Sequence, residues 1–167
     1  MFGLLKKKKN EETKNSELVL VAPVNGKTIP LADVPDPVFS EKLAGEGIAI
    51  EPSDDLIVSP ADGELSLVLK TKHAFALTLP NGIELLVHIG LETVGLNGEG
   101  FEQLVEAGKT VKAGTPIIKI DREFIKSKGC ELITPILITN PDITTSITPI
   151  ENIDVSAGKT AIVKYTV

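Results

Sequence analysis

The sequence predicts an all-β fold, an antiparallel β-sandwich of barrel-like form with one or two short helices. β-Branched residues are abundant, with 18 Ile, 14 Val and 14 Thr, and their stiff side chains pack well on a pleated sheet. Residues that favour turns are frequent too, with 14 Gly and 11 Pro. Several turn sequences also occur twice, which indicates an internally duplicated motif within one domain.

The duplicated turns lie in two pairs. Ala22–Gly26 and Ser59–Gly63 each follow a short apolar run and read Pro-x-Asx-Gly, so each predicts a strand, a turn and a second strand. Gly108–Gly114 and Val155–Thr160 share the order Val-x-Ala-Gly. The spacing of these echoes is irregular, so the pattern favours a sandwich with internal quasi-symmetry over a solenoid.

Signals for helices are few. Residues 101–107 predict one or two helical turns ending at Gly108, and residues 122–128 predict another ending at Gly129. Pro35-Asp36-Pro37 predicts a loop, followed by a short turn, because proline disfavours a regular element on its N-terminal side.

The chain divides into a flexible N-terminal tail, residues 1–17, and one domain, residues 18–167. Two interpretations of the tail stay open. It is a disordered, solvated end, or its apolar tip at Met1–Leu5 and the lysines at 6–9 make weak contact with an anionic membrane surface.

Composition excludes several classes of function. The net charge of −6 argues against nucleic acid as a partner, because phosphate binding needs a positive field. A single cysteine cannot form an internal disulfide, and no secretory signal or run of 18 apolar residues is present. We therefore expect a cytoplasmic protein, peripheral at the inner face of the membrane if the tail binds there.

The two histidines flank a predicted hairpin whose turn lies within Leu79–Gly82. A turn centred on Asn81-Gly82 would place His88 diagonal to His73, and a turn centred on Pro80-Asn81 would place the two directly opposite. Both registers put the imidazoles on one face, because side chains alternate along a strand.

That face is expected to carry Phe75, Leu77 and Leu86 beside the histidines, as a partly exposed apolar patch that docks a partner. The alternative is that the hairpin is buried on both faces and the histidines are satisfied core residues. Gly90 has no side chain, so another backbone segment can approach there.

Two facing imidazoles predict phosphoryl chemistry. A neutral imidazole is a nucleophile near physiological pH, and a second imidazole can donate a hydrogen bond to a phosphoryl oxygen. The same pair could bind zinc, but a protein zinc site has three or four ligands, so a carboxylate from this chain or from a partner would be needed.

Residues 82–94, Gly-Ile-Glu-Leu-Leu-Val-His-Ile-Gly-Leu-Glu-Thr-Val, resemble the phosphorylation-site signature of the glucose-type enzyme IIA of the bacterial phosphotransferase system, and the likeness continues to Phe101. The segments 70–75, 33–39 and 47–50 resemble the same family. The resemblance covers residues 18–167 and implies a duplicated antiparallel β-sandwich.

The resemblance also implies roles for individual residues. His88 would accept the phosphoryl group on Nε2, His73 would orient and stabilise it, and Thr71 would hydrogen-bond His73. The expected partner-binding surface comprises Val38, Phe39, Phe75, Leu86, Glu92 and Val94. The family often has Asp where Glu92 stands and Phe where Leu69 and Leu86 stand, so the predicted patch is less aromatic here.

The family takes phosphate from the carrier HPr and passes it to a cysteine of the IIB domain of a membrane sugar transporter. The resemblance implies that the protein requires no cofactor. Zinc held by His73, His88 and a partner carboxylate occurs in some family complexes. The alternative is a non-enzymatic regulatory binding protein. Regulatory partners known in the family are sugar permeases, glycerol kinase and adenylate cyclase.

Overall fold

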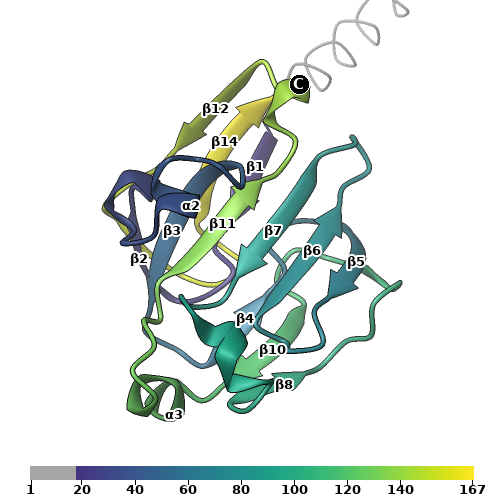
Figure 1. Cartoon of the computed structure of the whole chain (residues 1–167). Coiled ribbons are helices and arrows are strands. Elements are labelled where there is room, and N and C mark those ends of the chain that lie inside the picture. Colours follow the sequence, from purple (N-terminus) through teal and green to yellow (C-terminus); the bar gives the residue numbers. More distant parts are fainter. Residues whose placement is uncertain (1–17) are drawn as a thin grey trace, which may run out of the picture.

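The computed structural model describes residues 18–167, in which strands form three antiparallel sheets accompanied by short helices (Figure 1). The predicted N-terminal tail and its membrane contact lie outside the described residues. The all-β prediction is confirmed, and the sheets wrap around one main core. Among residues 18–167, no helix has the length and apolar character needed to cross a membrane.

The largest sheet has eight strands and carries the functional hairpin near its middle. In spatial order its strands are β13 (Asp154–Val155), β2 (Gly26–Ile29), β3 (Glu46–Pro52), β11 (Thr134–Ile138), β7 (Glu84–His88), β6 (Ala74–Thr78), β5 (Gly63–Val68) and β9 (Thr110–Val111). One three-stranded sheet consists of β1 (Leu18–Val21), β14 (Ala161–Thr166) and β12 (Ser146–Pro149). The other consists of β4 (Leu56–Val58), β10 (Pro116–Ile120) and β8 (Phe101–Gln103).

Helical segments are short and connect strands. They are η1 (Leu31–Asp33), α2 (Pro37–Ser40), η2 (Thr93–Leu96), α3 (Arg122–Ser127) and η3 (Pro141–Ile143). The predicted helix over 122–128 is confirmed as α3, whereas the predicted helix over 101–107 is wrong. Residues 101–103 form the strand β8 instead, with Phe101 buried and paired with Ile120 of β10. This pairing supplies hydrogen-bond partners for backbone groups that a one-turn helix would leave without partners. After Pro35, where we expected a loop and a turn, α2 begins with Pro37 in its first turn.

The duplicated Pro-x-Asx-Gly turns meet each other. The Val21 amide donates to the Pro60 carbonyl at 2.9 Å, and the Val58 amide donates to the Pro23 carbonyl at 2.6 Å. The two repeated turns therefore exchange equivalent hydrogen bonds, as expected for a local two-fold axis.

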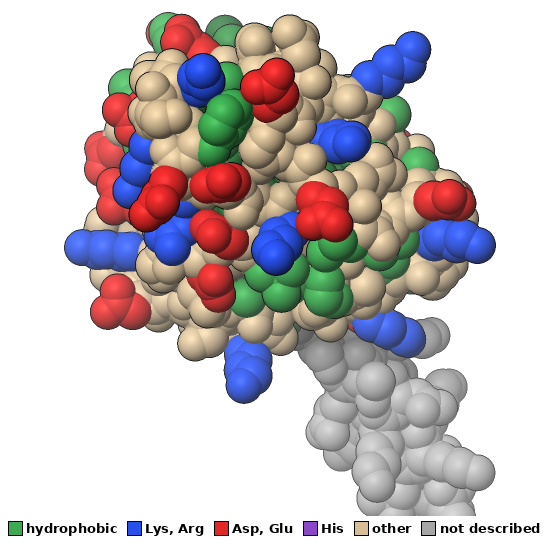
Figure 2. Space-filling view, turned by 90° about the horizontal axis from the view of Figure 1, so that it is seen from below, with side chains coloured by type: hydrophobic (Ala, Val, Ile, Leu, Met, Phe, Trp, Pro, Cys, Tyr) green, Lys and Arg blue, Asp and Glu red, His purple; other side chains and the backbone are tan. Residues whose placement is uncertain are grey.

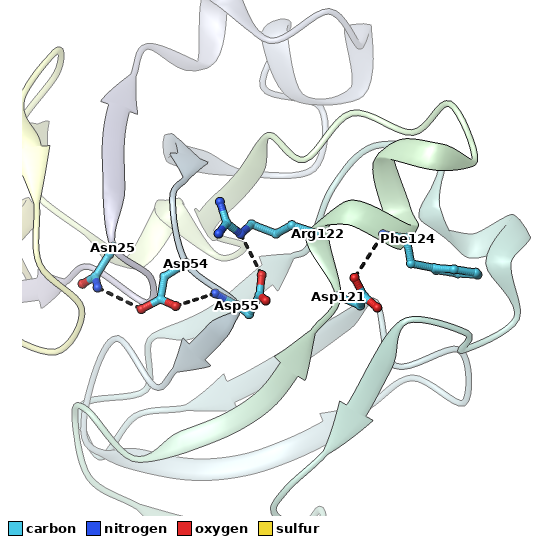
Figure 3. Close-up of polar contacts among 6 residues, drawn as sticks. All are labelled: Asn25, Asp54, Asp55, Asp121, Arg122 and Phe124. Atoms are coloured by element: carbon cyan, nitrogen blue, oxygen red, sulfur yellow. Dashed lines mark hydrogen bonds and ion pairs between the residues drawn. The ribbon is translucent and has the colours of Figure 1, made fainter.

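Each turn also accepts a hydrogen bond from one of the two loops that share the order Val-x-Ala-Gly. Asn25 Oδ1 accepts from the Ala157 amide at 2.7 Å, and Asp62 Oδ1 accepts from the Ala113 amide at 2.8 Å. Asn25 also donates to Asp54 at 3.0 Å (Figure 3). The two bonds to Ala157 and Ala113, equivalent in the two halves, support the predicted internal duplication.

The N-terminus of helix α3 is held by a capping residue and by an ion pair to a neighbouring segment (Figure 3). Asp121 caps the helix by accepting from the Phe124 amide at 3.1 Å. Arg122 Nε donates to Asp55 Oδ1 at 2.7 Å, which ties the helix to the connection before β4.

Two hydrophobic clusters lie on opposite faces of the large sheet. The main core receives the inward residues of β7 and β6, including Leu85, Val87 and Phe75. A smaller cluster contains Phe39 from α2 and Leu137 from β11, and Leu86 of β7 packs against it. This second cluster fastens α2 to the outer face of the sheet, in front of β3 and β11 (Figure 1).

Candidate functional site

The hairpin that carries the histidines has a three-residue turn. The Leu79 amide donates to the Ile83 carbonyl at 2.8 Å, and Gly82 has a φ of 90°. A positive φ at the third residue is typical of three-residue hairpin loops. His88 therefore pairs with Ala74, and both predicted registers are wrong because each assumed a two-residue turn.

His73 nevertheless lies against His88. Lys72 has a φ of 57° and His73 precedes the first residue of β6, so the imidazole is free of the strict alternation of the strand. The His73 carbonyl accepts from the Ile89 amide at 2.6 Å, which fixes the segment beside the end of β7. The ring centroids are 5.0 Å apart with an interplanar angle of 82°, so the predicted meeting of the imidazoles is confirmed.

Each imidazole is held through Nδ1 by a neighbour two residues away. Thr71 Oγ1 lies 2.7 Å from His73 Nδ1, and the Gly90 carbonyl lies 2.7 Å from His88 Nδ1. A carbonyl can only accept, so Nδ1 of His88 carries the proton and Nε2 of the neutral ring carries the lone pair. A hydroxyl can donate or accept, so His73 is not restricted to one tautomer.

Burial favours the neutral form of both rings. His73 is 4% exposed, and its pKa is lowered from the ordinary value by burial and then by repulsion from His88. Burial also lowers the pKa of His88, while the hydrogen bond to Gly90 and the charge of Asp36 raise it in part. The lone pair of His88 is therefore available at neutral pH.

One wall of the site comes from α2. The Phe39 ring lies 5.1 Å from the His88 ring and is almost fully buried. Asp36 caps α2 by accepting from the Val38 amide at 3.0 Å, which keeps its carboxylate near His88. The cluster beneath α2 thus sets the position of one aromatic ring and one charge beside the imidazole.

The predicted partner surface divides into exposed and buried residues. Val38 and Val94 are 45% and 57% exposed, Glu92 is exposed, and Leu86 is half-buried. Phe39 is a wall of the histidine site. The placement of Phe75 and Leu77 on the exposed face is wrong: each is 1% exposed in the main core, because the three-residue turn places them opposite Val87 and Leu85.

The surface on another side of the molecule shows no charge segregation. Figure 2 shows Lys and Arg interspersed with Asp and Glu, a strip of hydrophobic side chains, and no histidine on this face of residues 18–167. Such mixing is typical of a solvated surface.

The described residues do not form a zinc site of their own. No group of three or more His, Cys, Asp or Glu side chains within 18–167 is arranged to hold a metal ion. The two imidazoles alone fall short of the three or four ligands of protein zinc sites.

Sequence reasoning missed two contributors to the site. The first is the Gly90 carbonyl, whose orientation depends on a φ of 75° that glycine adopts readily. The second is Asp36, for which the Asp-Pro helix start was the available signal. Both act on His88 through the backbone or through space, which a pattern of residue types does not reveal.

Residues 18–144 match the family described as phosphoenolpyruvate-dependent sugar phosphotransferase system, EIIA 1. The chain is 46% identical over 168 residues to a glucose-specific EIIA component from Staphylococcus epidermidis RP62A, covering 100% of this chain and 99% of that protein. It is 44% identical over 166 residues to one from Bacillus anthracis, covering 99% and 96%. The glucose permease IIA from Mycoplasma capricolum has a TM-score of 0.84 and 34% identity, with 90% of this chain and 96% of that chain covered. The chain belongs to the EIIA 1 family of the phosphoenolpyruvate-dependent sugar phosphotransferase system.

Proposed function

We propose that this chain is a phosphocarrier that accepts a phosphoryl group from phospho-HPr on Nε2 of His88 and passes it to a cysteine of the IIB domain of a membrane glucose transporter. The observation that carries the proposal is the hydrogen bond from His88 Nδ1 to the Gly90 carbonyl, since it directs the lone pair to Nε2. Family membership and the glucose-specific relatives support the partner and sugar classes.

Acceptance of the phosphoryl group requires a neutral ring. The Nε2 lone pair of His88 attacks phosphorus, and the bond from phosphorus to the donor breaks, with its electron pair leaving on the donor atom. The ring becomes cationic as the new N–P bond forms, and the Gly90 carbonyl stabilises the proton that stays on Nδ1.

His73 is suited to hold the phosphoryl oxygens. When Thr71 donates to Nδ1 of His73, Nε2 of His73 carries a proton and can donate it in a hydrogen bond. With the ring centroids 5.0 Å apart, a group on His88 Nε2 lies within reach of this donor. In the onward step a thiolate of IIB attacks phosphorus, and the electron pair of the N–P bond returns to His88 Nε2.

The surroundings fit successive partners. Val38, next in the chain to the Phe39 that contacts His88, and Val94 are exposed and provide apolar surface for a partner. Asp36, Glu92 and Glu131 line one hollow at this end of the molecule, which favours partners with cationic groups.

The test is intact-protein mass spectrometry after incubation with phosphoenolpyruvate, the general kinase of the system and HPr. We expect wild type to gain the mass of one acid-labile phosphoryl group and His88→Ala to gain none. Phosphorylation that survives in His88→Ala would refute the assignment of His88. No gain in folded wild type would refute the carrier role and favour a regulatory binding protein that uses the same surface.

A further inference from the structure

Thr93 is a fully buried polar residue just beyond the histidine site. It is 0% exposed and is the first residue of η2. Its Oγ1 donates to the Ile89 carbonyl at 2.7 Å. The hydroxyl therefore fixes the peptide group that joins Ile89 to Gly90, directly after His88.

The next peptide group holds His88. Its carbonyl, that of Gly90, accepts from His88 Nδ1 at 2.7 Å, and its N–H, that of Leu91, donates to the Glu131 carbonyl at 3.0 Å. The imidazole, this peptide group and Glu131 thus form one chain of hydrogen bonds, in which each bond polarises the next.

The methyl group of Thr93 restricts the same segment. A Cβ atom built on Gly90 would lie 2.7 Å from Thr93 Cγ2 and 2.7 Å from the Glu131 carbonyl oxygen. Gly90 is therefore enclosed between the Thr93 methyl and the backbone of the segment before β11, at a φ of 75°. Rotation of the Gly90 carbonyl away from His88 would require one of these neighbours to move.

We propose that Thr93 is a positioning residue for His88: its hydroxyl and methyl orient the Gly90 peptide group, which keeps the proton of the neutral imidazole on Nδ1 and leaves Nε2 as the nucleophile. The consequence for phosphoryl transfer rests on the function proposed above. The effect on the imidazole does not, because it concerns the unphosphorylated chain alone.

The test measures the tautomer of His88 by ¹⁵N NMR of imidazole-labelled protein, at a pH where both imidazoles are neutral. We expect wild type to hold mostly the Nδ1–H form, and Thr93→Ser, which keeps the hydroxyl but loses the methyl, to lie between wild type and Thr93→Val. Thr93→Val removes the hydroxyl at similar volume and should lower the ratio of Nδ1–H to Nε2–H by about tenfold, the effect of one hydrogen bond. The rate of phosphoryl acceptance should fall with the fraction of His88 in the Nδ1–H form, by about twofold if the ratio falls from about ten to about one, with unchanged affinity for HPr.

Thr28→Val is the matched control, because Thr28 is also 0% exposed and donates its hydroxyl to a backbone carbonyl, that of Ile150, at 2.8 Å. It should lower stability without changing the tautomer. If Thr93→Val does not fold, Thr93→Ala removes the same hydroxyl and leaves room for water.

A folded hydroxyl-free variant with the wild-type tautomer ratio would overturn the proposal, and so would an equal tautomer change in Thr28→Val. Failure of wild type to accept phosphate would refute the phosphocarrier function, and the tautomer ratio would still decide the role of Thr93.

Discussion

The segments that carry the two imidazoles, 71–73 and 88–90, differ in what holds Nδ1. In the first a hydroxyl contacts His73, and in the second a backbone carbonyl contacts His88. The carbonyl allows one neutral tautomer, whereas the hydroxyl allows both. Similar spacing, with each partner two residues away, therefore produces one ring suited to attack and one suited to donate.

The segments also differ in rigidity of attachment. Gly90 is enclosed by Thr93 and Glu131, while Thr71 is half-buried in a turn that contains Lys72 at a φ of 57°. The difference indicates that the carbonyl that holds His88 is enclosed by distant parts of the chain, whereas the hydroxyl that holds His73 lies in a local turn, although the His73 backbone is bonded to Ile89. If the two rings have the proposed roles, substitutions in the two segments should affect different half-reactions.

The largest expected effect separates acceptance from onward transfer. His73→Ala should still be phosphorylated by phospho-HPr, but its transfer to IIB should slow by roughly a hundredfold, because a donor to the phosphoryl oxygens is lost. Rapid-quench measurement of each half-reaction checks this result. His73→Gln, which keeps an N–H donor, should recover part of the rate, and equal loss in both half-reactions would contradict the division of roles.

Gly90→Ala should destabilise the domain by about 2 kcal/mol or more, because the new Cβ meets Thr93 and Glu131 at a positive φ. Urea unfolding measures the change. Gly95→Ala is the matched control, since a Cβ there has no heavy atom within 4 Å and no positive φ. Equal effects of the two substitutions would show that the enclosure of Gly90 does not constrain the segment.

Thr71→Val removes the hydroxyl from His73 at similar volume. We expect onward transfer to slow by about tenfold, the effect of one hydrogen bond on the orientation of the donor ring, while acceptance is unchanged. The same two half-reactions provide the measurement. Thr78→Val, at the other end of β6, serves as control and should leave both rates unchanged.

The sequence predicted the fold class because its causes are local: β-branched strands, turn residues and the repeated Pro-x-Asx-Gly turns. It also predicted that His73 and His88 meet, although the register was wrong. The choice between a two-residue and a three-residue turn depends on the conformation of Gly82, which composition does not specify. The misplacement of Phe75 followed directly, because a shift of one residue transfers a side chain to the other face of a sheet.

The charge of Asp36 gives the smallest expected effect and acts on only one of the two rings. Asp36 raises the pKa of His88, so Asp36→Asn should lower that pKa further below its ordinary value and leave the pKa of His73 nearly unchanged. Asn also caps helices, so stability should change little. At any pH near the pKa a larger fraction of His88 is then neutral, so the pH at which phosphoryl acceptance declines on acidification moves down. NMR titration of both imidazoles and the pH profile of acceptance measure the two shifts. An upward shift for His88, or equal shifts for both rings, would mean that Asp36 does not act directly on His88 and that α2 contributes only the Phe39 wall.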